Sequence, residues 1–328
     1  MPDLARRRLG SQGPLASAIG FGAAVLSPGY YEPVEDAAAI DVLRYALDCG
    51  INLIDTSNVY GLGHNETLVG RAVAGRRDQV LIASKFGWVV DGSSGSAVQV
   101  KYDMPGIRAN GHPAYVHQCI DESLRRLDTD YLDLYYQHFP DPAVPVEETV
   151  GAMADLVRQG KVRHLGLCNV DAATLERAQR VHPIAAVQNE FSLWARQPER
   201  ELLPAAERLG VALVTWCPLG SGFLAQDFSE VHDYRCVQAR FKAGNLAENR
   251  RRFEPLRQLA GDLGISEACL ALAWLLHRGP GVVPIPGMTQ RRHVDDNLTA
   301  TTLSLDAATL ARIDVLAPPG LAVGDLLF

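Results

Sequence analysis

No hydrophobic run in this 328-residue sequence approaches the roughly 20 residues that a membrane-spanning helix needs. The three arginines from Arg6 to Arg8 are not followed by the apolar segment that a signal peptide contains. Both absences weigh against a membrane or secreted protein. We therefore expect a cytoplasmic protein without a membrane partner.

The sequence also has few cysteines, and their spacing matches no CxxC or Cys/His pattern of a metal site. A chain of this length does not need disulfides to hold its core together. We therefore interpret the cysteines as reduced thiols and expect no bound metal. They are Cys49, Cys119, Cys168, Cys217, Cys236 and Cys269.

Positive charge is scarce as well, since the formal net charge is −7. A nucleic-acid-binding face needs an excess of lysine and arginine, so no nucleic-acid partner is expected. The longest basic run, Arg250–Arg252, has Glu248 and Glu254 beside it and is typical of a solvated helix face. No cluster of basic residues indicates a phosphorylated or carboxylated substrate.

No linker divides the chain, so we predict one domain over residues 1–328. Short apolar runs alternate with amphipathic stretches of about 10 to 15 residues, a pattern that predicts βαβ units with a parallel sheet. The strand-like runs lie near residues 19–22, 51–54, 80–84, 131–136, 162–167, 185–188, 211–216 and 282–285, and the helical patterns near 36–49, 65–74, 114–127, 147–159, 171–180, 199–209, 248–263 and 266–277.

Eight such units suffice to close a barrel, so the predicted fold is a (β/α)8 TIM barrel. A β-hairpin formed by Arg8–Gly10 and Leu15–Ser17 is expected to precede it. Residues 86–113 and 217–247 are too long for simple βα turns, and both follow strands at the predicted active face. Long loops at that face are usually functional.

Four polar residues stand where three strand-like runs end: Asp55 and Tyr60, then Lys85, then His138. In a parallel barrel the carboxyl ends of the strands converge on one face, so we expect these residues to be neighbours. An ammonium about 4 Å from a phenol, at an effective dielectric of about 20, favours the phenolate by up to roughly 4 kcal/mol. The set therefore predicts proton transfer by Tyr60, with a lowered pKa.

Each of these residues also has a structural interpretation that the sequence leaves open. Asp55 and Tyr60 can organise a strand-to-loop turn, and Lys85 can form a salt bridge at the barrel rim. His138 can be a buried histidine with satisfied hydrogen bonds. Their joint position at successive strand ends favours the catalytic interpretation.

These segments resemble the aldo-keto reductase family over nearly the whole chain, from Leu9 to about Leu316. The similar segments are Gly50–Gly61, which carries the aspartate and tyrosine, Asn65–Gly70, Ala83–Lys85 and Tyr131–His138. The resemblance implies a (β/α)8 barrel that binds an extended nicotinamide cofactor without a Rossmann domain and reduces aldehydes or ketones. It also implies that Tyr60 is the general acid, that Lys85 and Asp55 tune it, and that His138 orients the carbonyl.

The resemblance extends to the cofactor site. It implies that Asn169 and Gln188 hold the nicotinamide carboxamide, that Trp216 stacks on the ring, and that backbone amides of the next turn bind the pyrophosphate. Asp296 and Asn297 are similar to the residues on the adenine side. The implied cofactor-binding set is Cys168, Asn169, Gln188, Trp216, Cys217, Pro218, Leu219, Ser221, Gly222, Arg240, Gly287, Met288, Thr289, His293, Asp296 and Asn297.

Some positions depart from the family pattern. Cys168 and Cys217 replace common serines, and we interpret them as packing groups and not as catalytic thiols. Met288 replaces a serine or threonine, and His293 stands where many members have an arginine for the 2′-phosphate. Thr289, Gln290 and Arg291 are available nearby, as is Arg240. We therefore expect NADPH as the preferred cofactor, with NADH possible.

The expected substrate is a small carbonyl compound. Val25, Trp88, Phe139 and Phe191 are candidate pocket walls, and their apolar character favours a hydrophobic aldehyde or ketone. Two alternatives stay open: an NAD-dependent aldose or alcohol dehydrogenase, and a cofactor-binding barrel that acts as the redox-sensing partner of another protein. The sequence does not predict the oligomeric state or the pathway.

Overall fold

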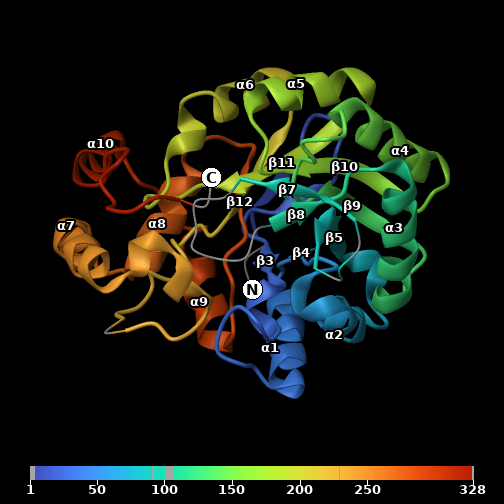
Figure 1. Ribbon diagram of the computed structural model, residues 1–328. Coiled ribbons are helices and arrows are strands. Elements are labelled where there is room, and N and C mark those ends of the chain that lie inside the picture. The colour runs from blue at the N-terminus through green and yellow to red at the C-terminus, as the bar shows by residue number, and fades with distance from the viewer. Residues whose placement is uncertain (1–3, 91, 93, 100–106, 229, 327–328) are drawn as a thin grey trace.

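The computed structural model describes residues 4–90, 92, 94–99, 107–228 and 230–326. At its centre lies an eight-stranded sheet whose neighbouring strands all pair in parallel (Figure 1). In sheet order the strands are β3 (Phe21–Gly22), β4 (Leu53–Asp55), β5 (Leu81–Phe86), β9 (Leu132–Gln137), β10 (Val162–Cys168), β11 (Ile184–Glu190), β12 (Ala212–Trp216) and β13 (Val282–Pro284).

The sheet closes on itself between its first and last strands. The amide of Gly20 donates to the carbonyl of Pro284 at 2.9 Å, and that of Gly22 donates to Pro286 at 3.1 Å. Every predicted strand matches an observed one within a few residues. The prediction of a (β/α)8 barrel is therefore confirmed.

Helices surround the barrel, and the predicted ones are all present within a few residues, except that α7 begins five residues early. They are α1 (Asp36–Asp48), α2 (His64–Val73), α3 (Pro113–Leu127), α4 (Val146–Arg158), α5 (Ala172–Val181), α6 (Leu202–Leu209), α7 (Ala243–Asp262), α8 (Glu267–Leu276), α9 (Arg291–Thr299) and α10 (Ala307–Leu316). The last two were not predicted. In the part of the chain described, no single helix qualifies as a membrane span, and only α7 and α8 together, bent by 90°, pass that test.

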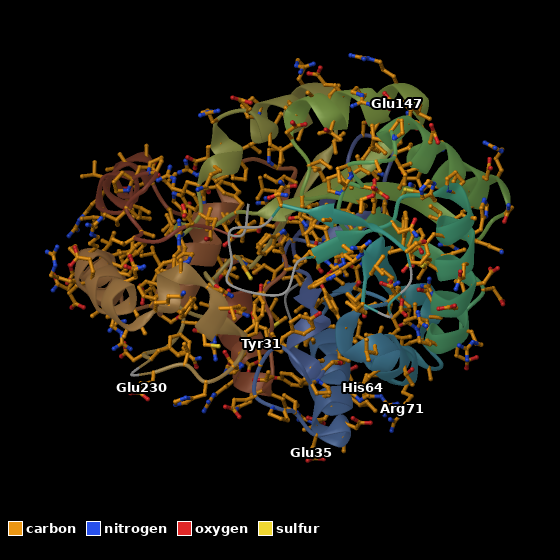
Figure 2. All side chains as sticks on the ribbon, viewed as in Figure 1. Tyr31, Glu35, His64, Arg71, Glu147 and Glu230 are labelled. Carbon is orange, nitrogen blue, oxygen red and sulfur yellow. The ribbon has the colours of Figure 1, made fainter. Side chains whose placement is uncertain are left out.

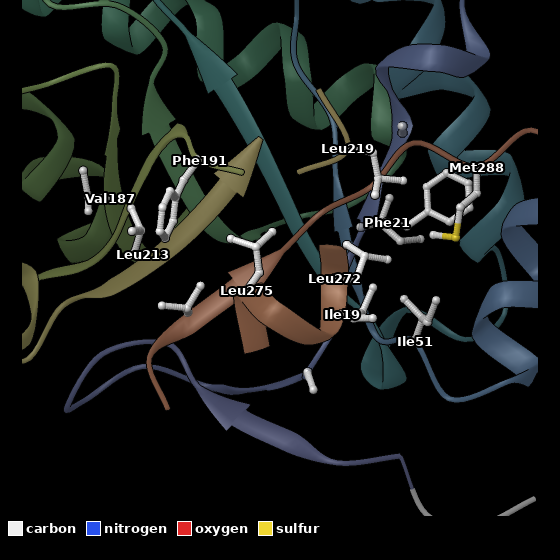
Figure 3. Packing of buried hydrophobic residues seen from close by; sticks show 14 of the residues in the cluster. Ile19, Phe21, Ile51, Val187, Phe191, Leu213, Leu219, Leu272, Leu275 and Met288 are labelled. Carbon is white, nitrogen blue, oxygen red and sulfur yellow. The ribbon is translucent and has the colours of Figure 1, made fainter. Parts of the chain in front are cut away.

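The helix α8 is apolar on all sides, and its residues from Ala268 to Leu275 are buried. Such a helix needs cover on more than one face. In Figure 1, α7 and α10 lie outside α8 and supply this cover. The main core lies between the strands and the helices. There Leu213 of β12 and Phe191, which follows β11, pack near Leu272 and Leu275 of α8 (Figure 3).

The amino-terminal hairpin, β1 (Arg6–Arg8) with β2 (Leu15–Ser17), closes one end of the barrel. Leu9 and Ala16 are fully buried and belong to the same core cluster as the interior strand residues Leu53 and Leu134. Gly10 has φ +72°, and a Cβ there would lie 2.5 Å from the carbonyl oxygen of Ala185. The predicted hairpin cap is confirmed.

At the opposite end, the loop between β5 and α3 forms a small antiparallel sheet that the sequence did not predict. Its strands are β6 (Trp88–Val89), β7 (Ser96–Val98) and β8 (Ile107–Ala109). These strands are short and lie in a segment rich in Gly and Ser, so they show no alternation of apolar and polar residues that would predict a strand. They are stabilised by packing, since Ile107 and Ala109 form a cluster with Phe139 from the barrel.

Ion pairs at the start of α1 hold the loop that follows β3. His64 Nε2 lies 2.9 Å and Arg71 Nη1 3.1 Å from the Asp36 carboxylate, which draws the first helix against the second (Figure 2). His64 Nδ1 also contacts Ser27 Oγ at 3.0 Å. These contacts hold residues 27–35 beside the barrel mouth, where the candidate site lies.

Candidate active site

The four predicted catalytic residues come together at the carboxyl ends of three adjacent strands. Asp55 ends β4, Lys85 lies near the end of β5, His138 follows β9, and Tyr60 begins the short 3-10 helix η2 (Tyr60–Gly63). Lys85 Nζ connects two of the others, because it forms an ion pair with Asp55 and donates to Tyr60 Oη at 3.2 Å. It also donates to the carbonyl of Thr56 at 2.9 Å.

The Asp55–Lys85 pair lies in the barrel interior, where both side chains are almost completely buried. The second carboxylate oxygen of Asp55 accepts a hydrogen bond from Gln188 Nε2 at 2.8 Å. Burial raises the pKa of Asp55, and the charge of Lys85 and the two hydrogen bonds oppose this rise. The pair is thus a satisfied buried network and not a rim salt bridge.

The structure corrects the expected pKa of Tyr60. Burial raises this pKa well above 10, and the nearby Asp55 carboxylate raises it further. Lys85 does not reverse the shift, because the same Asp55 that contacts its ammonium compensates its charge. Tyr60 therefore stays a protonated phenol at neutral pH, and it can donate a proton.

His138 is held by contacts on several sides. Its amide donates to Phe86 O at 2.7 Å, its carbonyl accepts from Asn169 Nδ2 at 2.9 Å, and its Nδ1 lies 3.2 Å from Ser57 Oγ. Burial and the Lys85 charge lower its pKa well below 6.5, so the imidazole is neutral at pH 7. In the tautomer in which Ser57 donates to Nδ1, the proton of the imidazole is on Nε2 and is available to a substrate oxygen.

Two residues predicted for the nicotinamide lie together beside this group. The Trp216 indole donates to Asn169 Oδ1 at 3.1 Å, and both residues line a cavity of about 730 Å³. Asn169 has φ +56°, a strained value for a residue other than glycine, and such strain is concentrated at functional sites. An amide next to a partly exposed aromatic ring fits a planar ring that bears a carboxamide, so these residues fit a nicotinamide.

The two thiols near this cavity are not nucleophiles. Cys168 is fully buried, and burial raises its pKa well above 9. Burial also raises the pKa of Cys217 to about 12, with a further contribution from Glu190. A neutral thiol is a weak nucleophile, so the geometry supports the interpretation of both cysteines as packing groups.

The turn after β12 fits a phosphate group. Cys217, Gly220, Ser221 and Gly222 all have positive φ, of 45°, 57°, 54° and 92°. The amides of Gly220 and Gly222 are used within the turn, where they donate to Cys217 O at 2.9 Å and to Leu219 O at 3.1 Å, and the amide of Ser221 bonds the Cys217 thiol. The amide of Leu219 donates to no backbone carbonyl that the structure describes. Backbone amides in such a turn can bind an anion.

The segment predicted for the adenosine end follows β13. Gly287 is required by packing, since a Cβ would lie 2.4 Å from Val25 Cγ1. Met288 is fully buried, and Figure 3 shows it beside Phe21, so its side chain belongs to the core. The amide and hydroxyl of Thr289 lie 3.3 and 3.4 Å from His293 Nδ1.

The charges on α9 differ from those expected. Arg291 is bound by both oxygens of Asp41, at 2.9 and 2.6 Å, and Asp296 accepts from Ser266 Oγ at 2.7 Å. Arg292 is exposed and forms no ion pair or hydrogen bond with the residues described. Arg292, and not Arg291, is therefore the cation available beside His293. The side chain of Asn297 is buried.

Two residues that were predicted for the site, Arg240 and Phe191, lie outside it. Arg240 is buried, and its guanidinium donates to the carbonyls of Trp194 and Gly324 and so fastens the carboxyl-terminal segment. Phe191 is fully buried and packs against Trp274 at a ring distance of 5.6 Å. It points from β11 towards the helices (Figure 3), so the prediction that it lines the pocket is wrong. Its neighbour Glu190 faces the cavity instead.

Aromatic rings lie against both Tyr60 and His138. Trp88 meets His138 edge-on at 5.3 Å, and Phe139 stacks on His138 at 5.0 Å. Tyr30 lies 5.7 Å from Tyr60, edge-on. Tyr234, from the long loop 217–247, lies 5.8 Å from Tyr30, and its amide donates to Tyr30 O at 3.0 Å.

The sequence reasoning missed Tyr30, Tyr234, Ser57 and Glu190. A signal existed for three of them. Tyr30 follows the first strand and Tyr234 lies in a loop already predicted to be functional, while Ser57 lies between Asp55 and Tyr60. Glu190 had no local signal, because its importance depends on the cavity beside β11 and β12.

Comparison with known proteins agrees with this geometry. Residues 18–318 match the model of the Aldo/keto reductase family. A probable aldo-keto reductase from Glycine max is 39% identical over 322 residues, which cover 97% of this chain and 90% of that protein. An aldo/keto reductase from Klebsiella pneumoniae, solved with NADP and acetate, is 29% identical with a TM-score of 0.74, covering 99% of each chain.

A glycerol dehydrogenase from Gluconobacter oxydans is 27% identical, with a TM-score of 0.83 over 100% of this chain and 99% of that one. The match to the family model spans most of the sequence, including Asp55, Tyr60, Lys85 and His138. The chain therefore belongs to the aldo/keto reductase family.

Proposed function

We propose that this protein is an NADPH-preferring oxidoreductase that reduces an aldehyde or ketone to the alcohol. The observation that carries the proposal is the position of Lys85 Nζ between the Asp55 carboxylate and the Tyr60 phenol, in a buried network at the barrel mouth. When bound, the nicotinamide supplies a hydride to the carbonyl carbon. The residues of the chain then have to bind the carbonyl oxygen and give it a proton.

Tyr60 is the proton donor, because its raised pKa keeps it protonated at neutral pH and its side chain is partly exposed. Lys85 donates to Tyr60 Oη and so stabilises the phenolate that remains after the transfer. Asp55 holds Lys85 in place through their ion pair. Neutral His138 donates from Nε2 to the carbonyl oxygen and orients it.

Support for the cofactor comes from the chain and from its relatives. Asn169 and Trp216 fit the nicotinamide, and the amide of Leu219 in the turn after β12 fits the pyrophosphate. Gln188 donates to Asp55 here and lies beside Asn169 on the neighbouring strand. Structures from Klebsiella pneumoniae hold NADP or NADPH. Arg292 and His293 together are the candidates for the 2′-phosphate.

The partly exposed rings of Tyr30, Trp88 and Tyr234 favour a hydrophobic carbonyl substrate, since apolar and aromatic walls bind apolar groups by burial. The reverse reaction, oxidation of an alcohol, is the second candidate. It is favoured by the similarity to the glycerol dehydrogenase from Gluconobacter oxydans.

Fluorescence titration with NADPH and NADH, followed by turnover assays on a panel of aldehydes, ketones and alcohols, tests the proposal. We expect quenching of the Trp216 emission by NADPH and faster turnover with carbonyl compounds than with alcohols. Turnover of alcohols with NAD alone would support the dehydrogenase. Cofactor binding without any turnover would support a redox-sensing role.

The preference for NADPH over NADH is expected to be modest and to depend on His293. Burial and the charge of Arg292 lower the His293 pKa below 6.5, so the imidazole is neutral at pH 7 and gains its charge only at lower pH. The ratio of NADPH to NADH affinity should therefore be flat above pH 7 and rise below about pH 6.5, the reference value for histidine. Protonated His293 then contributes a charge-assisted hydrogen bond.

Replacing His293 by arginine should increase the preference for NADPH over NADH at pH 7. The difference between the two binding free energies should grow by about 1 to 2 kcal/mol, the scale of one hydrogen bond to a charged group. The His293→Gln variant is the matched control, which should lose the rise at low pH. Equal affinities for both cofactors at every pH, in the wild type and the arginine variant, would remove the NADPH assignment.

A further inference from the structure

The side chain of Glu190 shares a cavity with the residues assigned to the nicotinamide. Glu190 is the last residue of β11, and with Asn169 and Trp216 it lines the cavity of about 730 Å³. Side chains two residues apart on a strand face the same side, so Glu190 lies above Gln188, about 7 Å further towards the barrel mouth. In the strand register, Glu190 is directly beside Trp216.

The carboxyl of Glu190 forms no hydrogen bond or ion pair with any residue that the structure describes. Three nearby groups interact electrostatically with this carboxyl: Arg240, Cys217 and Tyr234. Arg240 is cationic but is bound to the carbonyls of Trp194 and Gly324. The pKa of Cys217 is about 12, and that of Tyr234 is raised far above 10 by burial, so both are neutral.

The other acidic residues of the cavity have bonding partners, unlike the carboxyl of Glu190 among the residues described. Burial raises its pKa to about 7, against a smaller opposing effect of Arg240. Asp171 caps α5 through the amide of Thr174, and this bond lowers its pKa. Glu199 and Glu201 are paired with Arg196 and Arg200. Glu190 is therefore the carboxyl of this cavity that changes charge near neutral pH.

We propose that Glu190 makes the site distinguish the two redox states of the nicotinamide, so that its ionised carboxylate binds the oxidised cofactor more tightly than the reduced one. The inference rests on the proposed function, because it requires a nicotinamide beside Asn169 and Trp216. The oxidised ring carries a positive charge, and the reduced ring is neutral. Opposite unit charges about 10 Å apart, at an effective dielectric of about 20, change an affinity by about tenfold.

The effect depends on pH with a definite sign. Above pH 7 the carboxylate is ionised and attracts the oxidised ring, whereas below pH 7 the protonated carboxyl does not. Linkage is reciprocal, so binding of the oxidised cofactor must release a proton from Glu190 near pH 7. Product release after carbonyl reduction would therefore be slower at higher pH, where the oxidised cofactor is held more tightly.

The test measures the dissociation constants of NADP⁺ and NADPH by tryptophan fluorescence at pH 6, 7 and 8. For the wild type, we expect the affinity for NADP⁺ relative to NADPH to rise about fivefold from pH 6 to 8, because the carboxylate is partly ionised at both ends of this range. For Glu190→Gln we expect the ratio not to vary with pH. Calorimetry at pH 7 in two buffers of different ionisation enthalpy should show more protons released by NADP⁺ than by NADPH. NADP⁺ and NADPH both carry the 2′-phosphate, and His293 acts equally on both. These effects therefore cancel in the ratio of the two affinities.

Glu201→Gln is the matched control, because it removes a carboxylate from the same cavity at an exposed position already paired with Arg200. It should change the ratio by less than about twofold, as expected for a screened surface charge. A wild-type ratio that does not vary with pH, or a variation that persists in Glu190→Gln, would overturn the inference. The wild-type series decides the question even if the variant does not fold. Absence of any cofactor binding would overturn the proposed function itself.

Discussion

Replacement of Tyr60 by phenylalanine is expected to lower kcat by 10² to 10⁴, the usual contribution of a positioned general acid. The phenol is the group whose raised pKa keeps it protonated at neutral pH, and its oxygen accepts a hydrogen bond from Lys85 at 3.2 Å. Phenylalanine keeps the ring and its edge-on contacts with Tyr30 and His138. The affinity for NADPH should therefore stay within about twofold, and the loss should fall on the chemical step.

Steady-state kinetics with a carbonyl substrate, combined with fluorescence titration of the cofactor, measures both quantities. The matched control is Tyr30→Phe, which removes a neighbouring phenol that has no hydrogen bond to Lys85. We expect it to change kcat by less than about tenfold. A Tyr60→Phe enzyme that keeps more than about a tenth of the wild-type kcat would rule out Tyr60 as the general acid.

Replacement of Lys85 by methionine is expected to reduce both stability and activity strongly. It leaves the buried Asp55 carboxylate with Gln188 as its side-chain donor, and breaking a buried ion pair costs about 3 to 5 kcal/mol. Without the ammonium, the phenolate of Tyr60 also loses its stabilising charge. The pH profile for alcohol oxidation should then shift upwards, because the pKa of Tyr60 rises further.

The loss of stability should depend on pH. Burial raises the pKa of Asp55 in the wild type, and removal of Lys85 raises it more. A folded-state pKa above the unfolded value means that the native state binds more protons, so the stability of the variant should recover as the pH falls. Urea unfolding of Lys85→Met at pH 8 and pH 5 measures this change.

A double variant separates the structural role of Lys85 from the catalytic one. Lys85→Met combined with Asp55→Asn removes both charges, so it should regain most of the stability lost at pH 8. It should remain inactive, because nothing then stabilises the phenolate. A stable double variant with wild-type kcat would show that Lys85 serves only to neutralise Asp55.

The sequence by itself determined the order of the barrel strands and of helices α1 to α8, and the position of the four residues at strand ends. Apolar runs and helical periods are local, so they predict the elements without knowledge of the packing. In a parallel barrel the strand ends must converge, which is why Asp55, Tyr60, Lys85 and His138 were predicted as neighbours. The hairpin β1–β2 followed from its short strands and turn.

Only the tertiary structure decided which charges are free and which are paired. Arg291 binds Asp41, some 250 positions away in sequence, and Arg240 binds the carbonyls of Trp194 and Gly324. Arg292 is consequently the available cation near His293. No local pattern encodes such pairings, because they depend on segments that meet only after folding.

The same holds for the direction of pKa shifts. From the sequence, Lys85 was expected to lower the pKa of Tyr60, but burial and Asp55 raise it in the folded protein. Glu190 looks ordinary in the sequence, and its pKa reaches about 7 only because burial in the folded protein removes water from it. A pKa depends on solvent exposure and on all nearby charges, and both are properties of the packed molecule.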